Sequence, residues 1–297
     1  MKKFISIALI FSWLLAQEDV ISLPSGARLD LPHTANIRVD TIMVQSGATF
    51  AAESPRDFST AIATGDGTII TGQPLVSSVS SSTSDGAYNA GDTLLITITF
   101  SENVTITGTP QLTLETGSTD AVLNYGSGSG TATLVFRYIV ASGHTSPDLS
   151  YSSTNNLSLP NSDTKIQDSL VNDGVLTLPA PGAENSLNAN KALVIDTEAP
   201  TAGTVRDGSG TDVTYSGSNT SVTANWTGFS DTLSGIAGYE IAVGTTSGAT
   251  NVLSWTSAGN VTTYTKSDLS LTHATRYYVS TRALDAAGNY SSAATAN

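Results

Sequence analysis

Residues 93–100 read TLLITITF, and this stretch decides the fold class. Every second residue from Leu94 to Phe100 is apolar, so in an extended chain these side chains all face the same way. The pattern returns at residues 131–140 (TATLVFRYIV) and 277–284 (YYVSTRAL), each near a cluster of turn-forming residues. Short alternating strands between turn clusters predict an all-β fold of sandwich type.

The composition excludes several classes of protein. The chain has 297 residues, and 12 Lys and Arg against 25 Asp and Glu give a net charge of −13, which argues against a nucleic-acid partner. Cysteine is absent, so disulfide scaffolds and Cys-ligated metal centres are excluded. Only 12% of residues are charged, too few for a coiled coil.

The N-terminus is typical of an export signal. Residues 1–16 read MKKFISIALIFSWLLA, with two lysines before an apolar run that is too short to span a bilayer. We expect this segment to be removed, which lowers the net charge from −13 to −15 because two lysines are lost. No later stretch is apolar enough to cross a membrane, so we expect a secreted or cell-surface protein.

Residues 17–73 contain three similar pieces. Their central glycines, Gly26, Gly47 and Gly67, recur at roughly 20 residues, a period typical of short β-solenoid rungs. The segment is therefore either a β-rich, solenoid-like unit or an extended linker.

The rest of the chain divides into two parts of sandwich size. We expect one unit at residues 74–195 and another at residues 196–297. Residues 196–200 (DTEAP) form a short linker in which Pro200 restricts the direction of the chain.

The first of these units resembles the bacterial Ig-like repeats of large secreted surface and adhesin proteins. The resemblance rests on residues 85–92 (DGAYNAGD), 101–104 (SENV), 108–114 (GTPQLTL) and the closing phrase 192–200 (ALVIDTEAP). Three apolar faces are expected to close one core: Leu94, Ile96, Ile98 and Phe100; Leu112 and Leu114; and Leu134, Phe136 and Tyr138.

The second unit resembles a fibronectin type III module. The clearest piece is residues 271–277 (LTHATRY), which is similar to the corner before the family's F strand, with Tyr277 as the corner tyrosine. The resemblance also implies a B-strand tryptophan at Trp226 and a C strand at residues 238–244. Thr281 departs from it, because the family commonly has an apolar residue there.

The residues point to no catalytic centre. His33, His144 and His273 are far apart in sequence and lack metal-ligand spacing. Neither the bacterial Ig-like repeats nor the fibronectin type III modules are catalytic, so the resemblance implies no enzyme activity and no catalytic residues. A sugar-binding platform built from aromatic side chains stays an open alternative, and its candidate residues are Trp226, Trp255 and Tyr264.

Calcium is the one ion that the sequence suggests. Asp196 and Glu198 lie in the linker, and Asp231 and Asp285 lie in turns of the last unit. Ca²⁺ prefers carboxylate and carbonyl oxygens, and a cation here would clamp neighbouring units in a chain without disulfides. The alternative is that Asp and Asn simply favour turns.

These observations predict a non-catalytic, modular protein that acts as an adhesin, stalk or spacer, with an unidentified surface protein or glycan as its partner. One alternative is an accessory, carbohydrate-binding part of a secreted enzyme that acts on polysaccharides. Another is a fragment of a longer repeat adhesin.

Overall fold

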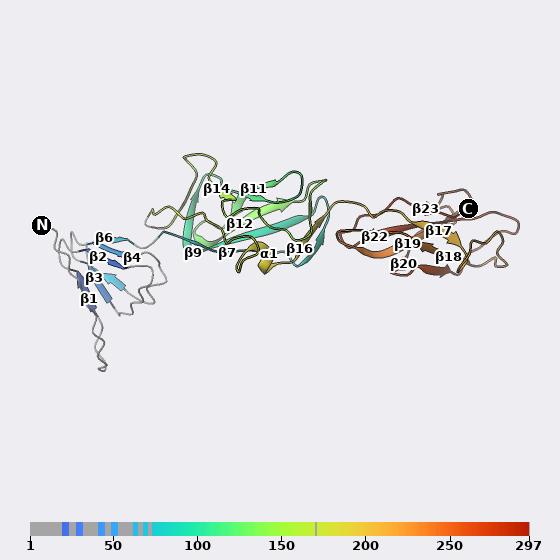
Figure 1. The fold of residues 1–297 in the computed structure, drawn as a ribbon, viewed down its shortest axis with the longest axis horizontal. Coiled ribbons are helices and arrows are strands. Elements are labelled where there is room, and N and C mark those ends of the chain that lie inside the picture. The colour runs from blue at the N-terminus through green and yellow to red at the C-terminus, as the bar shows by residue number, and fades with distance from the viewer. Residues whose placement is uncertain are drawn as a thin grey trace, which may run out of the picture.

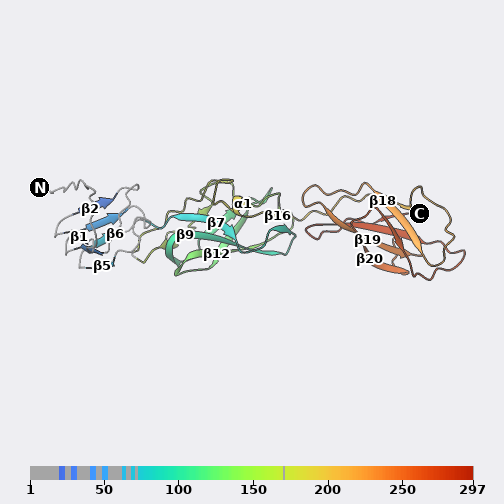
Figure 2. The ribbon, with the colours of Figure 1, turned by 90° about the horizontal axis from the view of Figure 1, so that it is seen from below.

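The computed structural model describes residues 73–169 and 171–296 in full, and the backbone of six short strands between residues 20 and 70. Its elements follow one another along a single axis, with β1 to β6 towards one end and the C-terminus at the other (Figures 1 and 2). The signal at residues 1–16, and His33, lie outside the described residues. Within them, no helix is long and apolar enough to cross a membrane.

The six short strands pair in parallel, at intervals of 21 residues in one sheet and of 21 and 19 residues in the other. One sheet has the order β1-β3-β5 and the other β2-β4-β6, and Val20, Thr41 and Ile62 occupy equivalent register positions 21 residues apart. Parallel pairing at this period is the geometry of stacked solenoid rungs, so the strand backbone agrees with the solenoid-like alternative and not with an extended linker. Their bounds are Val20–Leu23, Arg28–Leu31, Thr41–Val44, Thr49–Ala52, Ile62–Thr64 and Thr68–Ile70, for β1 to β6 in turn.

A β-sandwich, here called the central sandwich, follows. Its main sheet has the order β14-β10-β11-β12-β9-β15, with β7 also paired to β9, and a smaller sheet has the order β13-β16-β8. The one helix of the described residues, α1 (Leu187–Asn190), lies beside β7. The strands are β7 (Val76–Ser81), β8 (Gly86–Tyr88), β9 (Thr93–Thr107), β10 (Gln111–Leu114), β11 (Ala121–Ser127), β12 (Thr131–Ile139), β13 (Thr145–Ser146), β14 (Leu157–Ser158), β15 (Lys165–Gln167) and β16 (Leu193–Asp196).

The core of the central sandwich is built from the predicted faces. The nine apolar side chains of these faces are at most 2% exposed, and they belong to one continuous buried cluster. They are Leu94, Ile96, Ile98, Phe100, Leu112, Leu114, Leu134, Phe136 and Tyr138. Burial of this kind contributes about 1.5–3 kcal/mol for each large aliphatic or aromatic side chain. The period-two pattern therefore accounts for the main sheet of a chain that has no disulfide.

Seven further strands form the C-terminal sandwich around a second buried cluster. One sheet has the order β17-β18-β21 and the other β20-β19-β22-β23. Their bounds are Thr204–Asp207, Val222–Thr227, Ile236–Gly244, Leu253–Gly259, Thr263–Lys266, Tyr278–Asp285 and Ala294–Thr295, for β17 to β23 in turn. The prediction of tandem Ig-like and fibronectin III-like β-sandwiches is confirmed.

Details of the C-terminal sandwich agree with the fibronectin III resemblance. The Tyr277 hydroxyl accepts a hydrogen bond from the Thr272 N–H at 2.8 Å, as expected for a corner tyrosine. Trp226 lies on β18 and is 2% exposed, and its ring packs against that of Tyr239. Thr281 is fully buried, so a polar side chain does stand inside the core.

Candidate metal centre

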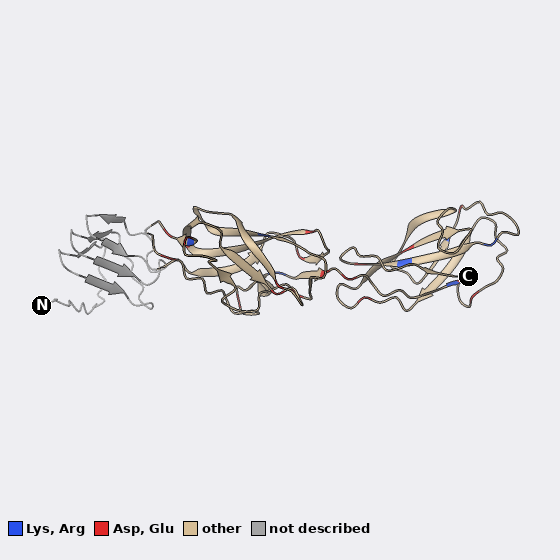
Figure 3. Ribbon diagram, turned by 90° about the horizontal axis from the view of Figure 1, so that it is seen from above, with Lys and Arg blue, Asp and Glu red and all other residues tan. Residues whose placement is uncertain are grey.

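Three carboxylates meet where the two sandwiches join. Asp196 is the last residue of β16, Asp285 is the last residue of β22, and Asp231 lies in the segment between β18 and β19. One oxygen from each lies within 4.8 Å of the other two. In Figure 3 the ribbon is red, the colour of Asp and Glu, at the junction of the two sandwiches. The structure thus brings together three of the four residues that the sequence suggested for calcium.

The carboxylates of Asp231 and Asp285 are fixed by their own turns. One oxygen of Asp231 accepts hydrogen bonds from the N–H groups of Leu233 and Gly235, at 3.0 and 2.6 Å. Asp285 accepts from the N–H and the side-chain amide of Asn289, both at 2.8 Å. Short Asp-centred turns of this kind form readily because the carboxylate replaces a backbone acceptor.

Asp196 connects the two sandwiches. Its Oδ2 accepts a hydrogen bond from the N–H of Ser234 at 3.2 Å and another from the Ser234 hydroxyl. Its backbone carbonyl accepts from the Asn289 side-chain amide at 3.1 Å. The last strand of the central sandwich is therefore held directly by two loops of the C-terminal sandwich.

The electrostatics of the cluster favour a cation. Asp196 and Asp285 are at most 1% exposed, and Asp231 is half-buried. Neither ion pair found among the described residues, Lys191–Asp85 and Arg282–Glu240, involves these three carboxylates. Closely spaced negative charges repel one another, and only N–H and hydroxyl donors offset them here. The oxygen donors fit Ca²⁺ chemistry, with three carboxylates beside the Ser234 hydroxyl.

Glu198 has a different place from the one its sequence position suggested. Its N–H donates to Asp196 Oδ1 at 3.0 Å, but its side chain is exposed and is not part of the carboxylate cluster. Ser234 was not anticipated, although residues 231–235 (DTLSG) carry an Asp followed by a small turn that could have indicated it.

The three aromatic residues considered for sugar binding have separate environments. Trp226 is in the core, and Tyr264 packs partly buried against it, so neither forms a surface platform. Trp255 is half-buried on β20, and the guanidinium carbon of Arg282 lies 4.5 Å from its ring centre. The same carbon lies 3.9 Å from the ring centre of Tyr290, so the guanidinium stacks on both rings.

Comparisons with known proteins give structural likeness only. No protein-family model and no curated protein matches the chain. A crystal structure of the FN1–FN3 domains of chicken CNTN1 is 14% identical, covers 76% of this chain and 65% of its own, and has a TM-score of 0.31. A run of titin domains is 15% identical, covers 76% of this chain and 67% of its own, and has a TM-score of 0.34. The chain thus spans about two thirds of the length of these structures. At such scores the likeness carries no argument about function.

Proposed function

We propose that this chain is a non-catalytic, exported spacer of a modular surface or secreted protein, with units at residues 17–73, 74–195 and 196–297. The observation that carries this proposal is the joint between the two sandwiches. The units lie end to end (Figure 1), and Asp196 at the end of one accepts hydrogen bonds from Ser234 and Asn289 of the other. Hydrogen bonds between the two sandwiches limit bending at their junction, as a protein that acts as a spacer requires.

The second part of the proposal is that calcium occupies the cluster of Asp196, Asp231 and Asp285. A divalent cation would neutralise carboxylates contributed by both sandwiches and would make the angle between them depend on the ion. Since the chain has no cysteine, such an ion would stiffen the rod where no disulfide can. A ligand at 100 times its dissociation constant stabilises the folded state by about 2.7 kcal/mol.

Spin labels on the two sandwiches test the joint. The absence of native cysteine allows Ser118→Cys and Asn260→Cys, both at exposed positions, to carry labels without background. We expect electron–electron distance measurements to give one narrow distribution in calcium and a broader one in EDTA. The variant Asp231→Asn should be broad in both conditions, and Asp163→Asn, an exposed acid far from the joint in sequence, should behave like the parent.

The two parts of the proposal fail in different ways. A distance distribution that is equally narrow with and without EDTA, in protein purified free of metal, would contradict calcium binding but would agree with the spacer role. A broad distribution under every condition would reject the spacer itself. Export is tested separately by fractionating native cells, because detection only in the cytoplasm would contradict it.

The accessory carbohydrate-binding role remains a second candidate because of the stacked group Trp255, Arg282 and Tyr290. Tyr290 is 41% exposed, and aromatic side chains with a few polar groups beside them are typical of sites that bind small molecules. Binding on a glycan array that is lost in Trp255→Ala but kept in Tyr264→Ala would support this role. Absence of any saccharide binding would count against it.

A further inference from the structure

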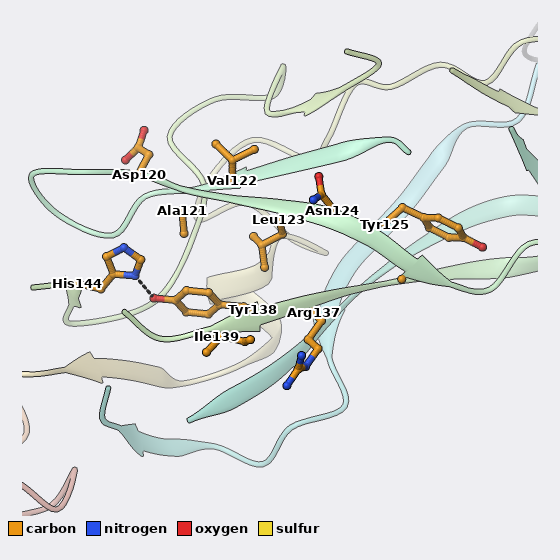
Figure 4. A pocket seen from close by; sticks show the side chains of 11 residues that line it. Asp120, Ala121, Val122, Leu123, Asn124, Tyr125, Arg137, Tyr138, Ile139 and His144 are labelled. Atoms are coloured by element: carbon orange, nitrogen blue, oxygen red, sulfur yellow. Dashed lines mark hydrogen bonds between the residues drawn. The ribbon is translucent and has the colours of Figure 1, made fainter. Parts of the chain in front are cut away.

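Two neighbouring strands of the central sandwich separate along part of their length. β11 and β12 pair at Tyr125 with Phe136 and at Ser127 with Val135, but no paired residues follow towards Val122 and Ile139. A cleft of about 530 Å³ opens there and is lined by both strands (Figure 4). Beside the cleft, β11 stays paired with β10 over residues 121–124 and β12 stays paired with β9 up to Ile139.

The backbone edges on the two sides of the cleft are open. In an antiparallel ladder, successive residues direct their N–H and C=O groups to alternate sides of the strand. Val140 bonds to Asp92 on the β9 side, so Ile139 directs its groups away from β9 and towards the cleft. The Tyr125 N–H donates to the Pro110 carbonyl on the β10 side. By the same alternation, the N–H and C=O groups of Val122 point towards the cleft.

The side chains at these edges are unusually apolar for an exposed surface. Val122 is 58% exposed and Ile139 is 49% exposed, and both belong to strands whose alternate residues are buried in the core. An exposed strand edge with apolar side chains is a template for a further strand.

Arg137 adds a positive charge beside the cleft. It is exposed, it donates a long hydrogen bond of 3.4 Å to Thr93, and within the described part of the chain it forms no ion pair. Asp120 also lines the cleft, at the end away from Arg137 (Figure 4), so the cleft carries one charge of each sign. An acidic group of a ligand is therefore favoured at the Arg137 end.

We propose that the cleft bounded by Val122, Arg137 and Ile139 binds an extended peptide segment by strand addition. The segment places apolar side chains, two residues apart, against Val122 and Ile139, and an acidic side chain against Arg137. Its backbone bonds to the open groups of both strands, the mode in which main-chain hydrogen bonds give affinity and alternate side chains give specificity. The site is independent of the metal centre and of the spacer role.

The direct test uses the full chain and a synthetic, end-capped peptide that alternates Val and Thr around one central Glu. We expect saturable binding by fluorescence anisotropy, with slowed amide hydrogen exchange at Val122 and Ile139. Ile139→Lys and Val122→Lys should each weaken binding by about tenfold or more. Val213→Lys replaces a similarly exposed valine of the C-terminal sandwich and should leave binding unchanged. Unchanged melting temperatures would show that all three variants fold.

Two further peptides separate strand addition from simple adhesion to an apolar patch. A peptide with N-methyl groups on alternate residues cannot form the backbone bonds and should not bind. The parent protein should bind a peptide with Gln in place of Glu more weakly than it binds the Glu peptide. Arg137→Gln should bind the two peptides equally well. Absence of saturation up to about 1 mM, or binding that ignores both N-methylation and the lysine variants, would overturn the proposal. So would a cleft that binds an oligosaccharide and excludes the peptide.

Discussion

Thr281 is the polar residue inside the core of the C-terminal sandwich. Its side chain is fully buried on β22, and its Oγ1 has no hydrogen-bond partner among the described residues. A buried hydroxyl without a partner costs about 1–3 kcal/mol in mutational data. Valine keeps the branched shape and replaces the hydroxyl with a methyl group. We therefore expect Thr281→Val to raise the free energy of unfolding by about 1–3 kcal/mol.

Calorimetry of the full chain measures this effect. A gain of 1 kcal/mol corresponds to about 4–8 °C in the melting temperature of a domain of 60–100 residues. Only the transition of the C-terminal sandwich should move. Thr263→Val, at an exposed position on β21, is the matched control and should change little. Thr281→Ala should melt below Thr281→Val because it leaves a cavity. If Thr281→Val melts at or below the parent temperature, the unpaired hydroxyl is not a cost and the reasoning is wrong.

Two other groups of the same sandwich give further predictions. Burial, followed by repulsion from Asp212, raises the pKa of Asp207 from 3.8 to about 6. The folded state then holds the proton more tightly, so this contribution to stability is complete below pH 3.8 and is lost as the pH rises through about 6. Asp207→Asn should therefore be more stable than the parent near pH 7 and should show a flatter pH dependence in thermal scans; an identical slope would contradict this. Tyr277→Phe removes the acceptor of the Thr272 N–H and should cost about 0.5–1.5 kcal/mol in urea unfolding. An unchanged midpoint would refute that role of the corner.

The strands could be predicted because their signal is local. Residues 93–100 alternate so regularly that their inward face follows from geometry, and Leu94, Ile96, Ile98 and Phe100 are buried as expected. The spacing of Gly26, Gly47 and Gly67, which lie outside the described residues, is close to the 21-residue interval between the parallel strands β1, β3 and β5. The alternation of apolar and polar residues does not indicate where the pairing between two strands ends. The end of the pairing between β11 and β12 is a long-range feature that the local alternation does not report.

The candidate site was predictable only in part, for a similar reason. Asp196, Asp231 and Asp285 were selected by residue type and by their place in turns, and the fold brings them together. Glu198 met the same criteria but points to solvent, because its backbone rather than its carboxylate serves Asp196. Trp226 had two interpretations, a B-strand tryptophan and part of a sugar platform, and its burial on β18 agrees with the first. Residue type alone does not distinguish these outcomes, since exposure is decided by the neighbouring strands.

The pairing of the two end strands determines how the central sandwich would respond to tension. Its first strand, β7, pairs with β9, and its last strand, β16, pairs with β8 and leads straight into the joint at Asp196. A force applied through the two ends pulls along these strands, while their hydrogen bonds run across them. Such bonds must shear together rather than open one after another. Stretching the rod therefore loads many bonds at once, and the first event at low force is expected to be release of the Asp196 joint, with both sandwiches still folded.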